Sequence, residues 1–200
     1  MTTVAVLPLK RFAQAKQRLD LGDRAGVMRD MARRVLGALQ GSALDAVLVV
    51  TADPDAAALA AEHGAAVVEE RELRGHSAAA VLGIAEAERL GATRVLLVAG
   101  DCPLLTSEDV DALLERHRDP GVVVFPDRHG TGTNALLIAP PRAMEPAFGE
   151  GSRARHERLA REAGTAVTVD EVLALARDVD TAEDLALVRA TLANVPQPGL

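Results

Sequence analysis

Short apolar runs alternate along the chain with longer stretches in which apolar residues recur every three or four positions. The runs, rich in β-branched residues, predict strands at 3–9, 45–51, 65–70, 94–101, 121–126, 134–140 and 165–169. The periodic stretches predict amphipathic helices at 23–40, 53–63, 77–91, 106–117, 152–163 and 181–193. This order predicts a single α/β domain over residues 1–193, a three-layer sandwich with helices on both faces of a mainly parallel sheet. Residues 194–200 are predicted to form a flexible tail.

Several of the predicted helices begin with capping signals. Asp53 precedes Pro54, which places an N-cap residue directly before proline at the first helical position. Ser77 is expected to cap the third helix. The pattern Thr-x-x-Asp, a relative of the capping box, opens the helices at 106–117 and 181–193.

Composition and charge exclude several classes of protein. The net charge is −7, and aromatic residues make up 2% of the chain, with no Trp and no Tyr. The chain therefore lacks the broad positive field and the stacking residues typical of nucleic-acid-binding proteins. Neither a bilayer-spanning run of roughly 18 apolar residues nor a secretory signal is visible. We expect a cytoplasmic enzyme or binding protein with no nucleic-acid or membrane contact.

The segment PLKRFAQAKQRL, residues 8–19, holds the only two lysines of the chain, Lys10 and Lys16, together with Arg18. The segment leaves the first predicted strand, and open α/β sheets bind ligands at the carboxyl ends of their strands. A lysine ammonium is a compact point charge that suits phosphate oxygens. The segment is therefore interpreted either as a phosphate-binding loop or as a solvated basic loop. The sequence has neither a Walker loop nor a Rossmann glycine fingerprint after this strand.

Asp101 lies at the end of another buried strand, in AGDCPLL, residues 99–105. A carboxylate in this position can bind Mg²⁺, which prefers one or two carboxylates plus substrate phosphates. The alternative is that Asp101 only caps the turn. Cys102, the single cysteine, leaves no intrachain disulfide and no multi-cysteine zinc site, and it is interpreted as a small buried residue and not as a nucleophile.

The segment PDRHGTGTNAL, residues 126–136, is rich in turn-forming residues. Its two glycines let backbone N–H groups approach a ligand closely. Thr133 and Asn134 add a hydroxyl and an amide, and we expect both to bind substrate. A plain hairpin loop is the alternative, and His129 is interpreted as a polar loop residue.

Two later segments carry further candidates. FGEGSRARH, residues 148–156, reads as a loop that opens a helix, with Arg155 in the first turn. Helix N-termini bind anions through free N–H groups, so we expect a phosphate or carboxylate site there. ARDVDTAEDL, residues 176–185, holds Asp178 and Asp180. Alone it reads as a capped helix, and with Asp101 it could complete a metal site.

Taken in order, these segments resemble the guanylyltransferases of coenzyme F-420 biosynthesis, which act on 2-phospholactate or phosphoenolpyruvate. The resemblance spans about residues 4–190. It implies the GT-A-like nucleotidyltransferase fold, GTP as donor, a small phosphorylated three-carbon acid as acceptor, and Mg²⁺ as cofactor. It also implies hand-over of an unstable product to the next enzyme. Among the acceptors we favour phosphoenolpyruvate, with 2-phospholactate and 3-phosphoglycerate as alternatives.

Matching positions carry the family's roles onto this chain. The resemblance gives the metal ligands as Asp101 and Asp180, with Asp178 as the alternative to Asp180. It gives the nucleotide-phosphate ligands as Lys10, Lys16 and Arg18. It gives the ligands of the acceptor's phosphate and carboxylate as Thr133, Gly149 and Ser152.

One segment departs from the family pattern. The family often has Gly-Leu-Asn before the third helix, where this chain has Gly75-His76-Ser77. Gly75 and Ser77 are expected to contact the nucleotide, so guanine selectivity is the property most affected by this departure. Two other readings stay open: a different nucleotidyltransferase or a glycosyltransferase of the same fold, and a catalytically silent GTP-binding regulator.

Overall fold

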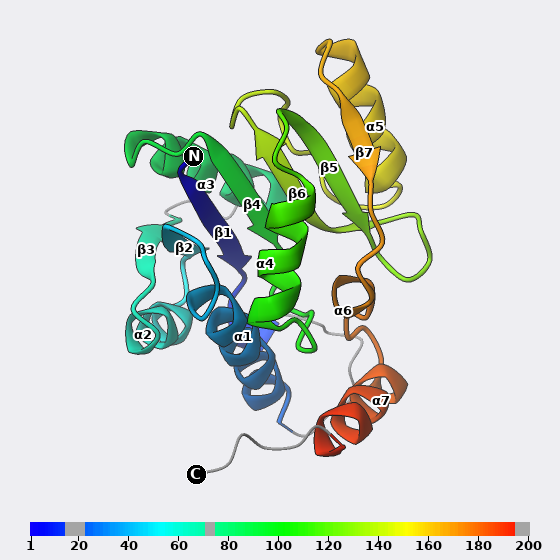
Figure 1. Cartoon of the computed structure of the whole chain (residues 1–200). Coiled ribbons are helices and arrows are strands. Elements are labelled where there is room, and N and C mark those ends of the chain that lie inside the picture. Colours follow the sequence, from blue (N-terminus) through cyan, green and yellow to red (C-terminus); the bar gives the residue numbers. More distant parts are fainter. Residues whose placement is uncertain (15–22, 71–74, 195–200) are drawn as a thin grey trace.

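The computed structural model describes residues 1–14, 23–70 and 75–194 of the 200-residue chain. Among these residues, seven strands form one sheet in the order β3-β2-β1-β4-β6-β5-β7 (Figure 1). The strands are β1 Thr3–Leu9, β2 Ala46–Thr51, β3 Ala66–Glu69, β4 Arg94–Val98, β5 Gly121–Pro126, β6 Thr133–Ala139 and β7 Val167–Val169. Within this sheet β6 alone runs antiparallel to its neighbours, which confirms the predicted mainly parallel α/β fold.

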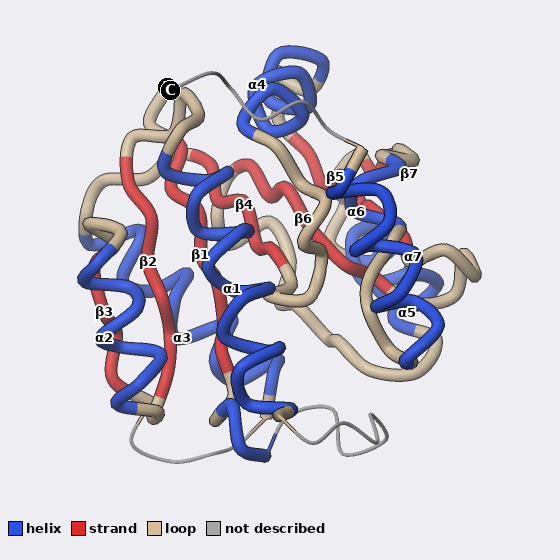
Figure 2. Tube along the Cα trace, turned by 90° about the horizontal axis from the view of Figure 1, so that it is seen from below, coloured by secondary structure: helices blue, strands red, loops and turns tan. Residues whose placement is uncertain are grey.

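Helices cover both faces of the sheet. One face carries α1 Arg24–Gln40, α2 Pro54–Glu62, α4 Ser107–Arg116, α6 Leu173–Ala176 and α7 Ala182–Ala193. The other face carries α3 His76–Arg89 and α5 Ser152–Glu162. Figure 2 shows α2 beside β3 at one end of the sheet and α6 near β5 toward the other. The three layers form one domain, and a 3-10 turn, η1 Phe12–Gln14, follows β1.

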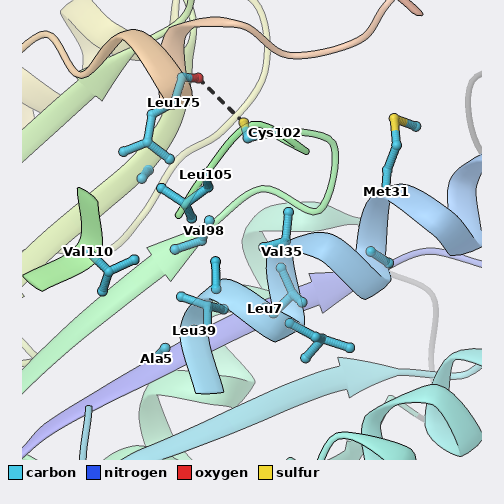
Figure 3. Packing of buried hydrophobic residues seen from close by; sticks show 14 of the residues in the cluster. Ala5, Leu7, Met31, Val35, Leu39, Val98, Cys102, Leu105, Val110 and Leu175 are labelled. Atoms are coloured by element: carbon cyan, nitrogen blue, oxygen red, sulfur yellow. Dashed lines mark hydrogen bonds between the residues drawn. The ribbon is translucent and has the colours of Figure 1, made fainter. Parts of the chain in front are cut away.

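The central strands are apolar on both faces because each face lies under helices. In β1, Val4 and Val6 belong to the core beneath α3, while Ala5 and Leu7 belong to the core beneath α1 and α4. Figure 3 shows the second of these cores, in which Leu7 and Val98 from the sheet pack against α1. This two-sided burial explains why the strands appear in the sequence as unbroken apolar runs.

Gly83 sets how closely α3 approaches the sheet. A Cβ atom added at this position would lie 2.2 Å from Cγ1 of Val6 and 3.0 Å from Cγ2 of Val50. Any larger residue would therefore push α3 away from β1 and β2. The close approach fixes the position of the N-terminal end of α3, which lies at the candidate site.

The antiparallel pairing of β5 with β6 contains a β-bulge. Phe125 pairs with Ala135, but the next residue, Pro126, pairs with Thr133, so Asn134 is an extra residue on the β6 side. A bulge changes the direction in which the side chains next to it point. The sequence pattern gave no sign of it.

The structure corrects several predicted boundaries. The strand predicted at 94–101 ends at Val98, so Asp101 lies in the following turn, and the strand predicted at 165–169 begins at Val167. The prediction that Ser77 caps the third helix is wrong: α3 begins at His76 with Gly75 as its N-cap and has no side-chain cap. The four-residue helix α6 was not predicted.

The capping predictions at 53, 106 and 181 are confirmed. Both Thr-x-x-Asp patterns form complete capping boxes, in which the threonine side chain accepts from the aspartate N–H and the aspartate accepts from the threonine N–H. Within the described part of the chain, no helix combines the length and the apolar character needed to cross a membrane.

Candidate active site

The candidate site lies where the strand order reverses. β1 lies between β2 and β4. The chain runs from β1 to β2 through α1 on one face of the sheet, and from β3 to β4 through α3 on the other face. Such a switch point leaves a crevice at the carboxyl ends of the two central strands. Lys10 directly follows β1, and Asp101 follows β4. The antiparallel β6 brings its first residues to the same edge, where the Ala99 N–H donates to the Asn134 carbonyl at 2.8 Å.

Three carboxylates gather at this edge. Asp101, Asp178 and Asp180 each place one carboxylate oxygen within 4.8 Å of the other two. The backbone brings them together, because the Val179 N–H donates to the Asp101 carbonyl at 3.0 Å. Carboxylate oxygens are the ligands that hard divalent cations prefer, so the donor set fits Mg²⁺. The two segments interpreted separately as a turn and a capped helix thus form one cluster.

Asn134 and Cys102 hold the segment that leads into this cluster. The Asn134 amide donates to the Leu175 carbonyl at 2.8 Å and to Oδ1 of Asp178 at 3.2 Å. The buried Cys102 thiol donates to the same carbonyl at 3.4 Å (Figure 3). Cys102 is therefore a small buried residue, as predicted, and the described contacts of Asn134 position Asp178.

Arg128 and Asp184 border the acidic cluster and were not predicted as site residues. The Arg128 guanidinium forms an ion pair with Asp184, and its NH2 group donates to Oδ2 at 3.0 Å. That oxygen also accepts from the N–H groups of Asp180 and Thr181. Burial alone would raise the pKa of Asp184, but Arg128 and these hydrogen bonds lower it to well below the usual aspartate range. The pair fixes the turn that carries Asp180.

Thr133, the other residue at the start of β6, contacts a different partner. Its Oγ1 lies 3.0 Å from Nδ1 of His156 in α5. Nε2 of the same imidazole accepts from the Ala147 N–H at 2.9 Å. His156 is fully buried, and this burial, assisted by the Arg155 charge, lowers its pKa to about 4. His156 is therefore a neutral residue at neutral pH that links β6 to the segment before α5.

Phe148 joins the two helices on this face of the sheet. Its ring meets the His156 ring edge-on, with centroids 5.1 Å apart, and the His76 ring at 4.5 Å. Its N–H donates to Oγ of Ser77 at 2.9 Å. The hydroxyl that was expected to cap α3 or to contact the nucleotide therefore holds the 147–151 segment against α3.

Gly149 and Gly151 shape the turn before α5. Gly149 has φ 116° and nothing within 4 Å of a Cβ added to it, so a ligand can approach its backbone. The prediction of free N–H groups at this helix start is wrong for Ser152 and Arg153. Their N–H groups donate to the carbonyls of Gly149 at 3.0 Å and Thr131 at 3.1 Å.

Arg155 is also engaged by the protein. Its guanidinium donates to the carbonyls of Ala147 and Glu150, both at 2.9 Å. These contacts stabilise the curved segment before α5, so the structure gives Arg155 a role in shaping the segment that carries Gly149. An acceptor contact by Arg155 stays a prediction.

Lys10 and His76 complete the edge next to Asp101. Burial lowers the pKa of His76 to about 4; the Asp101 carboxylate opposes this shift and the Lys10 ammonium adds to it. Lys10 itself is exposed. Gly75, at φ 99°, has open space around it. The other two predicted phosphate ligands, Lys16 and Arg18, lie outside the described residues.

Asp53 anchors the chain directly after Lys10. Its Oδ2 accepts from the Phe12 N–H at 2.7 Å, and its Oδ1 accepts from the Asp55 N–H at 3.1 Å. Sequence reasoning identified Asp53 only as a helix cap. The missed residues Arg128 and His156 both fall inside segments quoted as candidates, but no local pattern marks either of them, because their partners are distant in sequence.

The comparisons identify the family. The family model described as "Guanylyl transferase CofC like" matches residues 3–189. The chain belongs to this family. A phosphoenolpyruvate guanylyltransferase of Conexibacter woesei is 47% identical over 97% of this chain and 90% of its own length. A 2-phospho-L-lactate guanylyltransferase of Methanothermobacter thermautotrophicus is 37% identical over 92% of this chain and 83% of its own length.

A solved structure supports the fold assignment. A nucleotidyl transferase from Methanothermobacter covers 96% of this chain and 98% of its own, with a TM-score of 0.72 and 16% sequence identity. The predicted resemblance to the guanylyltransferases and the predicted nucleotidyltransferase fold are both confirmed. As a CofC-like guanylyltransferase, the chain is a nucleotidyltransferase.

Proposed function

We propose that this CofC-like guanylyltransferase transfers GMP from GTP to phosphoenolpyruvate in coenzyme F-420 biosynthesis. The products are enolpyruvyl-diphospho-guanosine and pyrophosphate. The observation that carries the proposal is the carboxylate cluster of Asp101, Asp178 and Asp180, placed at the switch point beside Lys10. The name of the Conexibacter relative supports the choice of acceptor.

The reaction needs no general base from the protein. A phosphate monoester has a second pKa of about 6, so the acceptor is already ionised near neutral pH. One of its oxygens forms a bond to the α-phosphorus of GTP while the α–β anhydride bond breaks, and the electron pair leaves on pyrophosphate. The site then contributes positioning and charge neutralisation.

The charged residues divide this work. Asp101, Asp178 and Asp180 would hold Mg²⁺, which when bound neutralises phosphate charge. Lys10, Lys16 and Arg18 would neutralise the charge that develops on pyrophosphate. A lysine can follow the phosphates as they separate, because its point charge is flexible, whereas an arginine fork demands a fixed geometry.

The neutral residues hold the acceptor. Thr133, Gly149 and Ser152 would bind its phosphate and carboxylate, with Asn134 and Arg155 acting mainly through the segments they support. Gly75 would lie near the nucleotide, with Ser77 behind it. Family membership also supports a cytoplasmic location and hand-over of the product to the next enzyme of the pathway.

The test is pyrophosphate release with GTP, Mg²⁺ and one acceptor at a time, with ATP and CTP as controls. Release with GTP and phosphoenolpyruvate alone is the expected result. Release with 2-phospholactate or 3-phosphoglycerate instead would replace the acceptor and keep the reaction. GTP binding without release from any pair would favour a silent regulator, and release with another nucleotide would favour a different nucleotidyltransferase.

A further inference from the structure

Thr133 and His156 form a buried pair whose proton positions can be deduced. The Ala147 N–H can only donate, so Nε2 of His156 must be the accepting nitrogen of the ring. In a neutral imidazole the other nitrogen then carries the proton, so Nδ1 donates to Oγ1 of Thr133 at 3.0 Å. The Thr133 hydroxyl accepts in this bond, and its own proton has to be donated elsewhere.

We propose that His156 is a positioning residue for the acceptor, because it makes the Thr133 hydroxyl a donor to an anionic oxygen of the bound phospho-acid. This inference rests on the proposed function, which places the acceptor at Thr133 and Gly149. His156 acts through Thr133 and through the segment that it holds at Ala147, and it does not itself touch the substrate.

The surroundings of His156 support this role. The imidazole is fully buried under Phe148 and stays neutral at working pH, which preserves the accepting nitrogen for Ala147. A protonated ring would carry two donors and would lose the Ala147 bond. The neutral ring therefore fixes both the direction of the Thr133 hydroxyl and the place of the segment next to Gly149.

Two substitutions separate the two contacts. His156→Gln keeps an acceptor near the position of Nε2 and loses the donor to Thr133. His156→Asn keeps an amide donor near the position of Nδ1 and loses the acceptor for Ala147. Thr133→Val removes the hydroxyl itself. Thr165→Val is the matched control. The Thr165 hydroxyl donates to the Ala143 carbonyl at 3.3 Å, and Thr165 precedes β7, so it lies at the end of the sheet opposite the candidate site.

The experiment measures KM for GTP, KM for phosphoenolpyruvate, kcat and the melting temperature of each variant. We expect His156→Gln and Thr133→Val each to raise the acceptor KM about tenfold, the scale of one hydrogen bond to a charged group. The GTP KM should stay within about twofold, because the GTP contacts lie elsewhere. The double variant His156→Gln/Thr133→Val should have an acceptor KM no higher than that of Thr133→Val alone. His156→Asn should raise the acceptor KM less than His156→Gln does.

Each other outcome is decisive. Equal rises in both KM values, or additive effects in the double variant, would show a merely structural role and overturn the inference. If His156→Gln does not fold, an unchanged acceptor KM in Thr133→Val would overturn it, and a tenfold rise there with partial retention in His156→Asn would support it. A wild-type chain that releases no pyrophosphate with any acceptor would refute the proposed function itself, and the inference with it.

Discussion

Thr133 and Asn134 are neighbours at the start of β6, and they serve two chemically different halves of the site. Asn134 reaches the α6 side of the sheet and holds Asp178, in an acidic half with Asp101 and Asp180. Thr133 reaches the α5 side and meets the neutral His156, which packs against Phe148. We call this side the neutral half; Arg155 lies beside it and donates to the Ala147 carbonyl.

The bulge in β6 is what separates the halves. Ala135 and Leu137 face the core under α1 and α4, so strict alternation would turn Thr133 to that same face. The extra residue at Asn134 reverses this order and places Thr133 opposite Pro126, toward α5. The comparison teaches that one short segment can both hold a carboxylate of the acidic cluster and, in the role proposed above, present the Thr133 hydroxyl to the acceptor.

The largest expected effect is in the acidic half. Asp101→Asn keeps the size of the side chain but removes an anionic oxygen ligand, and should lower kcat by about 10²–10³-fold, the scale of a lost electrostatic contact in a transition state. The melting temperature should barely change. The loss of kcat is measured by titrating Mg²⁺ in the pyrophosphate-release assay, with Asp109→Asn in the α4 capping box as the control. Turnover within threefold of wild type would remove Asp101 from the site.

Two buried histidines, His156 in the neutral half and His76 beside Asp101, should control stability between about pH 6.5 and 4. Burial lowers the pKa of His156 to about 4, so the unfolded chain binds a proton that the folded chain refuses in this range. Stability therefore falls as pH drops through the window, and His156 alone contributes up to about 3 kcal/mol of this loss at about 1.4 kcal/mol per pKa unit. Urea unfolding at pH 7 and pH 4.5 measures the loss.

His156→Gln should show a shallower loss in that window, because glutamine does not titrate. Asp184 in the acidic half has a different pH dependence. Arg128 and hydrogen bonds outweigh burial and lower the pKa of Asp184, so its contribution is lost only as pH falls below 3.8, the ordinary aspartate value. Equal pH slopes in wild type and His156→Gln would contradict the assignment.

Asn134→Leu should sharpen the comparison from the acidic side. It removes both hydrogen bonds that hold Leu175 and Asp178, and groups that orient metal ligands are worth about 10–100-fold in metal affinity or activity. The Mg²⁺ concentration for half-maximal rate should rise by that factor, with a smaller change in acceptor KM. Thr133→Val should raise the acceptor KM more than the Mg²⁺ requirement. If the two variants change both quantities equally, the two halves of the site do not differ in function.

The smallest effect compares the two capping boxes. Asp109→Ala and Asp184→Ala each remove the aspartate of a capping box and leave its N-cap threonine, a change worth about 1 kcal/mol of stability. Asp184→Ala also removes the ion pair to Arg128 and the contact to the Asp180 N–H, so it should lower activity severalfold. Asp109→Ala should lose stability alone. Chemical denaturation and initial rates, measured side by side, decide whether the second box belongs to the site.

Periodicity and strand exits predicted most of this molecule. Because the central strands are buried on both faces, they can be recognised in the sequence as apolar runs. The rule that ligands bind at strand ends pointed to Lys10, Asp101 and Thr133. Capping chemistry is local, so Thr106 and Thr181 were also found. These features depend on residues a few positions apart.

The missed features depend on pairs that are distant in sequence. Arg128 meets Asp184 56 residues later, and Phe12 meets Asp53 41 residues later. No local pattern encodes such contacts. Serine is a common helix cap, which favours Ser77 as the cap of α3. In the structure its hydroxyl instead accepts from the N–H of Phe148, 71 residues away. The bulge was missed because a one-residue excess appears only when both strands are known.

That excess has a consequence at the level of the gene. The acidic half and the neutral half lie on opposite faces because β6 contains one extra residue, which one codon encodes. A three-nucleotide deletion between Gly132 and Ala135 would leave nearly every predicted ligand encoded. It would restore plain alternation and leave the new residue next to Ala135 facing α5. The number of residues in this segment therefore matters to the site as much as which residues they are.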